Sequence, residues 1–374
     1  MKRKIIFFLF VLVFNTACSS LFQKQLEEKS ITPLLIHPNE KRFKSMVQLT
    51  FFGNNAEGYF SFDDSMLVFQ SDWNYRTQTQ RECDQIYRID ISSLDFTKNN
   101  TFQYELISTG KGRTTCSYFL KDNQILYSST HEIFPECPNP IRTYQGKYVW
   151  QLFDYDIYLF NPKTKELKKF VANKGYDAEA TVSPDGRYVV YTSMKSGDLE
   201  IWRKDLITGE EKQLTNELGY DGGAFFSYDS KKIVWRASRP KTKEEITLYK
   251  ELLSKNLVQP SELNVYVMDA DGKNKKQVTF LPGTNWSPFF HPSDQKILFS
   301  SNHHVLQKGG RTFHLFMINI DGTNLEQVTF GNEFESFPMF SFHKHKDHYW
   351  LVFASNRNAK RPRDTNLFIA EWVD

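Results

Sequence analysis

Apolar and polar residues alternate along most of the chain in short runs, and the clearest copy of the pattern spans residues 175–215. Four runs rich in β-branched and aromatic residues are separated there by turn residues at 184–186, 196–198 and 208–209. Alternation with a period of two, interrupted by Gly, Pro and Asp, is typical of short antiparallel strands joined by tight turns. The segment therefore predicts a four-stranded sheet.

The same unit recurs six times along the chain. Its inner strands read GYFSFDD, TCSYFLKDN, ATVSPDG, AFFSYDS, PFFHPSD and PMFSFHK. A second, a third and an outer strand accompany each, so six units supply 24 strands. A four-stranded sheet with two apolar faces cannot bury itself, so the copies must stack against one another.

The two ends of the array complete each other. The array begins with an outer strand at 46–50 and finishes on a third strand, TNLFIAEWV, that lacks an outer partner. Pairing these two strands closes the array into a ring, which removes exposed sheet edges. We therefore predict an all-β fold over residues 46–374: a six-bladed β-propeller of four-stranded antiparallel blades, closed by the N-terminal strand.

Three segments, SPDGRYVVYTS, MDADGKNKKQVTF and NIDGTNLEQVTF, resemble the repeat of TolB-like propellers. That repeat is distantly similar to the WD repeat and also occurs in the propeller domain of prolyl oligopeptidases. The resemblance covers about residues 46–374 and implies the fold more strongly than any function. TolB itself carries an α/β domain ahead of its propeller and the peptidases carry a hydrolase domain, and we expect neither here.

The N-terminal segment has the pattern of an export signal. A basic stretch at 2–4 precedes an apolar run at 5–14, which is too short to span a bilayer. Thr16 and Ala17 then supply the small residues that favour cleavage, immediately before Cys18.

This arrangement resembles a bacterial lipoprotein signal over residues 1–17, with Cys18 as the lipidated residue. Asn15 departs from the family pattern, which prefers Leu at that place, and an ordinary secretory signal is the alternative. We expect an exported protein on the periplasmic side of the envelope, anchored by lipid at the outer membrane, with residues 18–45 as a tether.

Charge narrows the classes of partner. Three of the 47 basic residues and none of the 44 acidic ones lie within residues 1–17, so the rest of the chain balances at 44 of each. Balanced charge offers no broad basic field for nucleic acid or anionic lipid. We expect a monomer that touches the membrane only through its anchor and whose partner is an envelope protein, a peptide or a cell-wall glycan.

The rim of the predicted propeller collects unusual side chains. Loops that enter the inner strands and loops that join second to third strands emerge on one face, where aromatic, acidic and guanidinium groups form a plausible binding surface. The alternative is that polar loop residues simply gather there. The predicted ligand-binding residues are Arg113, Tyr176, Asp177, Glu179, Tyr220, Asp221, Arg239, Trp286, Glu335 and Arg357.

An insertion at 240–262 predicts an amphipathic helix. Thr242 and Glu245 have capping-box spacing, and Ile246 and Tyr249 begin an apolar stripe at helical intervals. The stripe must be buried, either as a lid on the protein's own propeller or on a partner.

Three cysteines remain besides Cys18. An odd number in an oxidising compartment indicates one disulfide and one free thiol. Pairing of Cys137 with either Cys83 or Cys116 would pin the proline-rich insertion at 131–154.

Catalytic motifs are missing from the sequence. It contains neither GxSxG nor HExxH, so we expect a binding or scaffold module without a cofactor rather than a hydrolase. The alternative is a metal-assisted enzyme such as a polysaccharide lyase, because oligogalacturonate lyases have a related propeller with a metal in its mouth. His131, His303 and His304 are the candidate ligands for a divalent metal.

Overall fold

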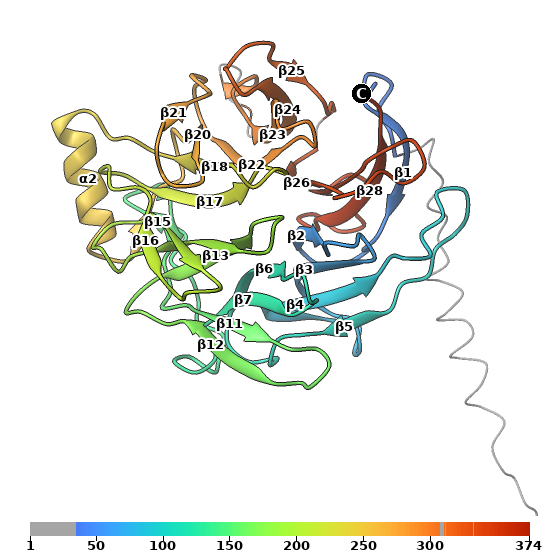
Figure 1. Ribbon diagram of the computed structural model, residues 1–374, viewed down its shortest axis with the longest axis horizontal. Helices are drawn as coiled ribbons and strands as arrows, with labels where there is room; N and C mark the ends of the chain where they lie inside the picture. The colour runs from blue at the N-terminus through green and yellow to red at the C-terminus, as the bar shows by residue number, and fades with distance from the viewer. Residues whose placement is uncertain (1–34, 307–309, 311, 332) are drawn as a thin grey trace, which may run out of the picture.

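The computed structural model describes residues 35–306, 310, 312–331 and 333–374. They form a ring of six four-stranded antiparallel sheets, with the inner strands β2, β6, β13, β17, β22 and β26 converging on its centre (Figure 1). The predicted six-bladed β-propeller is confirmed, including closure by the N-terminal strand. The predicted signal and Cys18 lie outside the described residues.

The blades follow one another in chain order. Blade one comprises β2 (Asn55–Phe60), β3 (Met66–Asn74), β4 (Thr79–Asp90) and β5 (Tyr104–Leu106). Blade two comprises β6 (Thr114–Phe119), β7 (Ile125–Ser129), β11 (Asp156–Phe160) and β12 (Leu167–Val171). Blade three comprises β13 (Asp177–Val182), β14 (Tyr188–Ser193), β15 (Glu200–Asp205) and β16 (Glu211–Gln213).

The last three blades have the same order. Blade four comprises β17 (Asp221–Phe226), β18 (Lys232–Ala237), β20 (Asn264–Asp269) and β21 (Lys276–Gln277). Blade five comprises β22 (Asn285–Phe290), β23 (Lys296–Ser301), β24 (His314–Asn319) and β25 (Glu326–Gln327). Blade six comprises β26 (Glu335–Phe340), β27 (Trp350–Ser355), β28 (Asn366–Trp372) and, as its outer strand, β1 (Phe43–Gln48).

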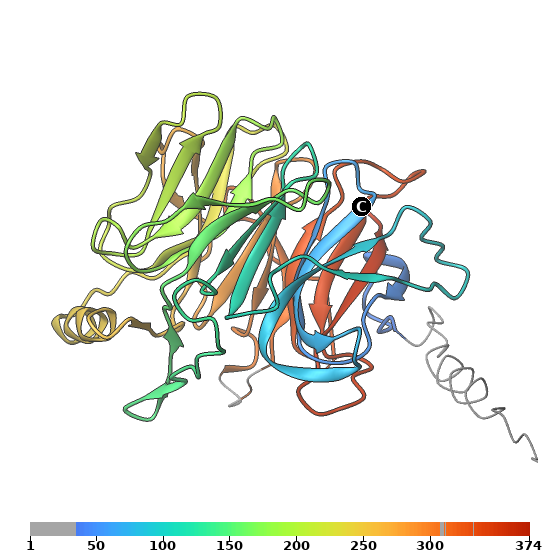
Figure 2. The same cartoon turned by 90° about the horizontal axis from the view of Figure 1, so that it is seen from below.

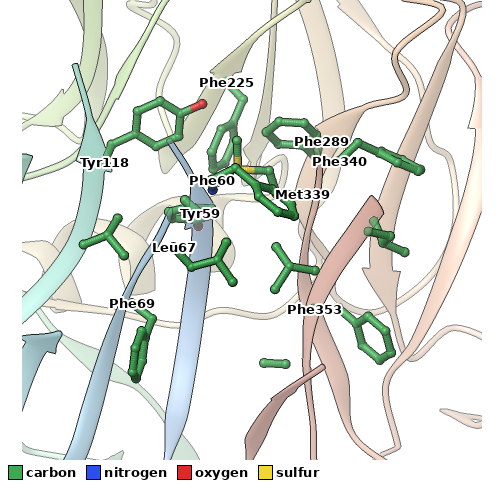
Figure 3. Close-up of a cluster of buried hydrophobic side chains, with 14 of the residues drawn as sticks. Tyr59, Phe60, Leu67, Phe69, Tyr118, Phe225, Phe289, Met339, Phe340 and Phe353 are labelled. Atoms are coloured by element: carbon green, nitrogen blue, oxygen red, sulfur yellow. Dashed lines mark hydrogen bonds between the residues drawn. The ribbon is translucent and has the colours of Figure 1, made fainter. Parts of the chain in front are cut away.

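Aromatic side chains from different blades fill the centre of the ring. Tyr59, Phe225 and Phe289 pack edge to face, with ring centroids 5.4 Å apart for the first pair and 5.1 Å for the second. Phe340 and Met339 of the sixth blade belong to the same cluster (Figure 3). Large buried aromatic side chains dominate the packing energy of such a core, so these contacts hold the blades together along the axis.

Each inner strand carries a β-bulge at its third residue. The backbone there is left-handed, with φ between 45° and 61°, and the pairing register shifts at the same place. The six bulge residues are Glu57, Cys116, Glu179, Gly223, Ser287 and Phe337. A bulge interrupts the two-residue alternation. For this reason five of the six strands begin three residues before the start that the alternation predicted.

Ring closure uses more than the pairing of β1 with β28. Arg357 is buried and donates to Glu40 Oε1 at 2.9 Å, to the Leu35 carbonyl at 2.8 Å and to the Glu335 carboxylate. The first of these partners lies in the stretch predicted as a tether, 18–45. Residues 35–45 of that stretch therefore belong to the folded body, and β1 starts at Phe43 rather than at 46.

The two insertions interlock instead of covering separate blades. Helix α2 (Lys243–Leu253) has the predicted capping box, and β19 (Leu257–Val258), which follows it, pairs with β10 (Trp150–Gln151) of the second-blade insertion. The other insertion also contains the hairpin β8 (Thr143–Tyr144) and β9 (Lys147–Tyr148). Both insertions project from the same side of the ring (Figure 2).

The apolar stripe of α2 is buried within the chain itself. Tyr249 packs with Leu152 and Tyr220, and Leu252 packs with Val149 and Leu257. Of the two alternatives for burying this stripe, a lid on the protein's own propeller or a contact with a partner, the structure shows the first. In the part of the chain that the structure describes, no helix is long and apolar enough to cross a membrane.

We predict that Arg357→Ala destabilises the protein by about 3–5 kcal/mol, because it leaves the buried Glu335 and Glu40 carboxylates without the counter-charge of the guanidinium. Guanidinium denaturation measures the change. Arg187→Ala is the matched control, since the Arg187–Asp205 pair has an arginine side chain 51% exposed and should cost about 1 kcal/mol or less. Equal losses in the two variants would contradict a special role for the closure cluster.

Candidate functional site

A cavity of about 330 Å³ lies between the interlocked insertions and the inner strands. Its aromatic walls come from both sources, namely Trp150, Phe153 and Tyr155 of the second-blade insertion and Tyr176, Tyr220 and Trp286 of the blades. Glu57, Cys116, Glu179 and Phe337, four of the six bulge residues, also line it. The bulges therefore present side chains from several blades to one space, which we call the mouth cavity.

Glu179 and Arg236 form a buried ion pair in the wall of the mouth cavity. Arg236 and Tyr220 donate to Glu179 Oε1, while Oε2 accepts from Thr192 Oγ1 at 2.7 Å and from the Gly223 amide at 2.8 Å. Both carboxylate oxygens are thus used within the fold. Glu179 and Arg236 form a neutral, hydrogen-bonded part of the wall.

The double glycine in β17 makes room for this pair. A Cβ on Gly223 would lie 1.7 Å from Arg236 Nη1, and one on Gly222 would lie 2.6 Å from Glu179 Oε2. At Gly223 the positive φ of 60° also favours glycine. A side chain at either place would displace the buried ion pair.

Glu57 is a buried carboxyl group that lines the mouth cavity. Its side chain is buried, with the residue 8% exposed, and its Oε2 has no hydrogen-bond partner. Burial raises the pKa of Glu57 to about 7; the nearby Glu179 carboxylate adds to this, while Cys116 and Arg236 act against it. Within the described residues this carboxyl group has no ion pair. It therefore faces the cavity with unused acceptor capacity.

A second, looser charge pair lies beside the disulfide. Arg113 is 3.8 Å from Asp84, donates to the Pro138 carbonyl at 3.3 Å and stacks over Phe153 at 5.3 Å. Burial raises the pKa of Asp84 to about 6, although the Arg113 guanidinium opposes the rise. The pair ties the second-blade insertion to β4.

The disulfide joins Cys83 to Cys137, with Cα atoms 5.7 Å apart. Of the two pairings left open by the sequence, the structure has this one, and Cys116 is the free thiol. The bridge anchors the proline-rich insertion that supplies part of the cavity wall. Burial raises the pKa of Cys116 well above its usual value, so the thiol stays protonated at neutral pH.

Half of the predicted rim residues reach the mouth cavity. Those that line it are Arg113, Tyr176, Glu179, Tyr220 and Trp286. The others hold loops in place inside the fold: Asp177 accepts from Asn173, Asp221 pairs with Arg239 at 2.7 Å and Glu335 pairs with Arg357. These carboxylates are the first residues of inner strands and are fully buried, so their expected position on an open rim is corrected.

Several residues of the mouth cavity are not predicted from the sequence. Glu57 fell in a loop because the bulge hid the start of β2, and Arg236 and Trp150 were not singled out. Aligning the six units on the buried polar residue that opens each inner strand would have placed Glu57 two positions after Asn55, as Glu179 follows Asp177.

The three histidines proposed as metal ligands do not form one cluster: the His303 and His304 rings lie 5.7 Å apart in the fifth blade, but His131 lies in the second blade. His131 contacts Ser129 in the second blade, His303 contacts Ser301 in the fifth, and the His304 ring stacks on His314 at 4.6 Å. None of them lines the mouth cavity. Among the residues described, no group of three or more His, Cys, Asp or Glu side chains could hold a metal ion.

We predict that Glu57→Gln stabilises the protein at neutral and higher pH. The folded pKa of about 7 lies above the ordinary value of 4.5, so ionisation of Glu57 lowers stability progressively as pH rises from 4.5 to 7. Compared with the wild type, the variant should gain up to about 3 kcal/mol at pH 8 and little at pH 4.5. Thermal unfolding across this range, with the surface variant Glu166→Gln as control, measures the effect. Parallel curves for wild type and Glu57→Gln would refute the raised pKa.

We further predict that, among the three cysteines of the described residues, non-reducing peptide mapping finds the Cys83–Cys137 bridge and one alkylatable thiol, Cys116, after denaturation. Reduction should expose the second-blade insertion to protease, because its anchor to β4 is lost. A mapped bridge between Cys116 and Cys137 would contradict the structure.

The chain is similar to known proteins over part of its length. No protein-family model matches the chain. The Tol-Pal system protein TolB of Wolinella succinogenes is 26% identical over 223 residues, which cover 59% of this chain and 47% of that protein. The Tol-Pal system protein TolB of Francisella tularensis subsp. mediasiatica is 27% identical over 141 residues, or 38% of this chain and 27% of that protein. The chain thus spans about half or less of the length of these relatives.

Solved structures agree on the fold. The crystal structure of TolB from Acinetobacter baumannii superposes with a TM-score of 0.53 at 18% identity, covering 78% of this chain and 61% of that one. These similarities confirm the resemblance indicated by the repeat. The chain is similar in sequence to part of TolB, and its described residues form a six-bladed propeller whose fold is similar to that of the TolB structure.

Proposed function

We propose that the protein is a binding or scaffold module of the bacterial cell envelope whose mouth cavity takes an extended peptide segment of a partner protein. The observation that carries this proposal is the cavity of about 330 Å³, walled by aromatic side chains around buried charges. That volume is at the small end of ligand pockets. It suits a few residues of a peptide rather than a folded domain.

The walls favour binding over covalent chemistry. Glu179 and Arg236 are fixed by their mutual pairing, and the protonated Cys116 thiol is a weak nucleophile. The positions of the histidines give no support to the metal-assisted alternative. The aromatic rings instead offer broad apolar area with polar edges, which is typical of protein-binding hot spots.

The relatives and the predicted export signal support a place of action in the cell envelope. The sequence relatives are named as Tol-Pal system proteins, which supports a protein partner in the envelope for this chain too. Lipidation of Cys18 would hold the propeller at the outer membrane, on its periplasmic side. Cys18→Ala should then move the protein from the membrane fraction to the soluble periplasmic fraction, and continued membrane attachment would refute the lipid anchor.

We predict that a photo-crosslinking residue placed at Tyr148 captures a discrete partner in intact cells. Tyr148 is 54% exposed and lines the mouth cavity. A second crosslinker at Ile207, which is 79% exposed on a turn between β15 and β16, is the matched control. Trp286→Ala should reduce capture at Tyr148 about fivefold or more, because it removes part of the aromatic wall. Identical crosslinks at both positions, insensitive to Trp286→Ala, would contradict a binding role for the mouth.

A further inference from the structure

We infer that the peptide bound in the mouth cavity carries a basic side chain, lysine or arginine, whose cationic end pairs with Glu57. This inference rests on the proposed function and names the chemistry of its ligand. Glu57 differs from the other carboxylates of the mouth cavity in having no ion-pair partner among the described residues.

The other two carboxylates that line the mouth cavity already have cationic partners. Glu179 and Arg236 pair with each other, and Asp84 lies 3.8 Å from Arg113. Glu57 occupies the same bulge position in blade one as Glu179 does in blade three, yet its Oε2 lacks the donors that Glu179 receives. A buried carboxylate without a partner is costly unless a counter-charge arrives, so a cationic group of the ligand completes the set.

The aromatic wall of the cavity that Glu57 lines suits a long basic side chain. Trp150 and Trp286 lie on the walls with ring centroids 5.7 Å apart, and Phe337 packs on Trp286 at 4.9 Å. Such rings bury an aliphatic stem and attract a cation to their faces. The protein already uses this contact, because the Arg236 guanidinium lies 5.8 Å from the centre of the Trp150 ring.

The groups that face Glu57 make its charge responsive to a ligand. Cys116 of β6, Glu179 of β13, Arg236 of β18 and Asp84 of β4 surround it, and burial raises its pKa to about 7. A bound ammonium or guanidinium favours the ionised carboxylate and lowers this pKa. Binding should therefore be about tenfold tighter at pH 8 than at pH 6, where most of the free protein holds Glu57 protonated.

The test begins with selection from a random peptide library displayed on phage, using the wild-type protein, Glu57→Gln and Trp286→Ala. We expect the wild type to enrich peptides with a lysine or arginine at a common position. Glu57→Gln should lose that preference, and Trp286→Ala should lose enrichment as a whole. Glu166→Gln, a surface variant away from the mouth, should select the same peptides as the wild type.

Synthetic peptides then measure the pair directly. Replacing the selected basic residue by norleucine should weaken binding to the wild type about thirtyfold, and Glu57→Gln should weaken the basic peptide by a similar factor. Combining both changes should cost little more than either one, because each removes the same contact. Tryptophan fluorescence reports occupancy, since Trp150 and Trp286 line the cavity.

The outcomes separate the inference from the proposed function. Peptides that are enriched through the mouth but carry no basic residue, or that bind Glu57→Gln unchanged, overturn the inference and leave the proposed function standing. A failure to enrich any peptide that depends on Trp286 overturns both. A norleucine peptide that binds as tightly as its basic counterpart would show that the cationic group makes no favourable contact with Glu57, and the inference is then wrong.

Discussion

Closure of the ring is the constraint on which the remaining structure depends. Six blades in an open row would leave an exposed strand at each end, and the pairing of β1 with β28 satisfies both ends at once. Arg357 reinforces the closure by joining Glu40 of the N-terminal stretch to Glu335 of the sixth inner strand. The axis, and hence the place where inner strands meet, exists only because the first and last strands of the array share one blade.

The bulge at the third residue of each inner strand converts this symmetry into a site. All six bulges have the same left-handed backbone, but the side chains that they carry differ: an acid, a thiol, a second acid, a glycine, a serine and a phenylalanine. Gly223 leaves the space that Arg236 occupies, so blade four contributes its charge from the second strand instead. A repeated backbone device thus gives an asymmetric set of groups around one axis.

The insertions turn the open mouth of the propeller into a walled cavity. The β10–β19 pairing joins the insertions of the second and fourth blades, and the Cys83–Cys137 bridge fixes the second-blade insertion to the first blade. Burial beneath such contacts lowers the local dielectric constant, which strengthens electrostatic interactions. The raised pKa of Glu57 and of Asp84 follows from this burial.

The sequence by itself determined the number of blades, the closure and the helix, because alternation, turn residues and a capping box are local signals that repeat along the chain. Five of the ten rim residues predicted from the sequence line the cavity, because loops on one face of a propeller lie close together around the axis. The sequence misplaced Asp177, Asp221 and Glu335, because a bulge hides the beginning of each inner strand from any reading by alternation. Only the tertiary structure decided which charges are paired. Glu179 has hydrogen-bond donors on both oxygens, whereas Glu57 Oε2 has none. The difference depends on donors from neighbouring blades, which lie far away in the sequence.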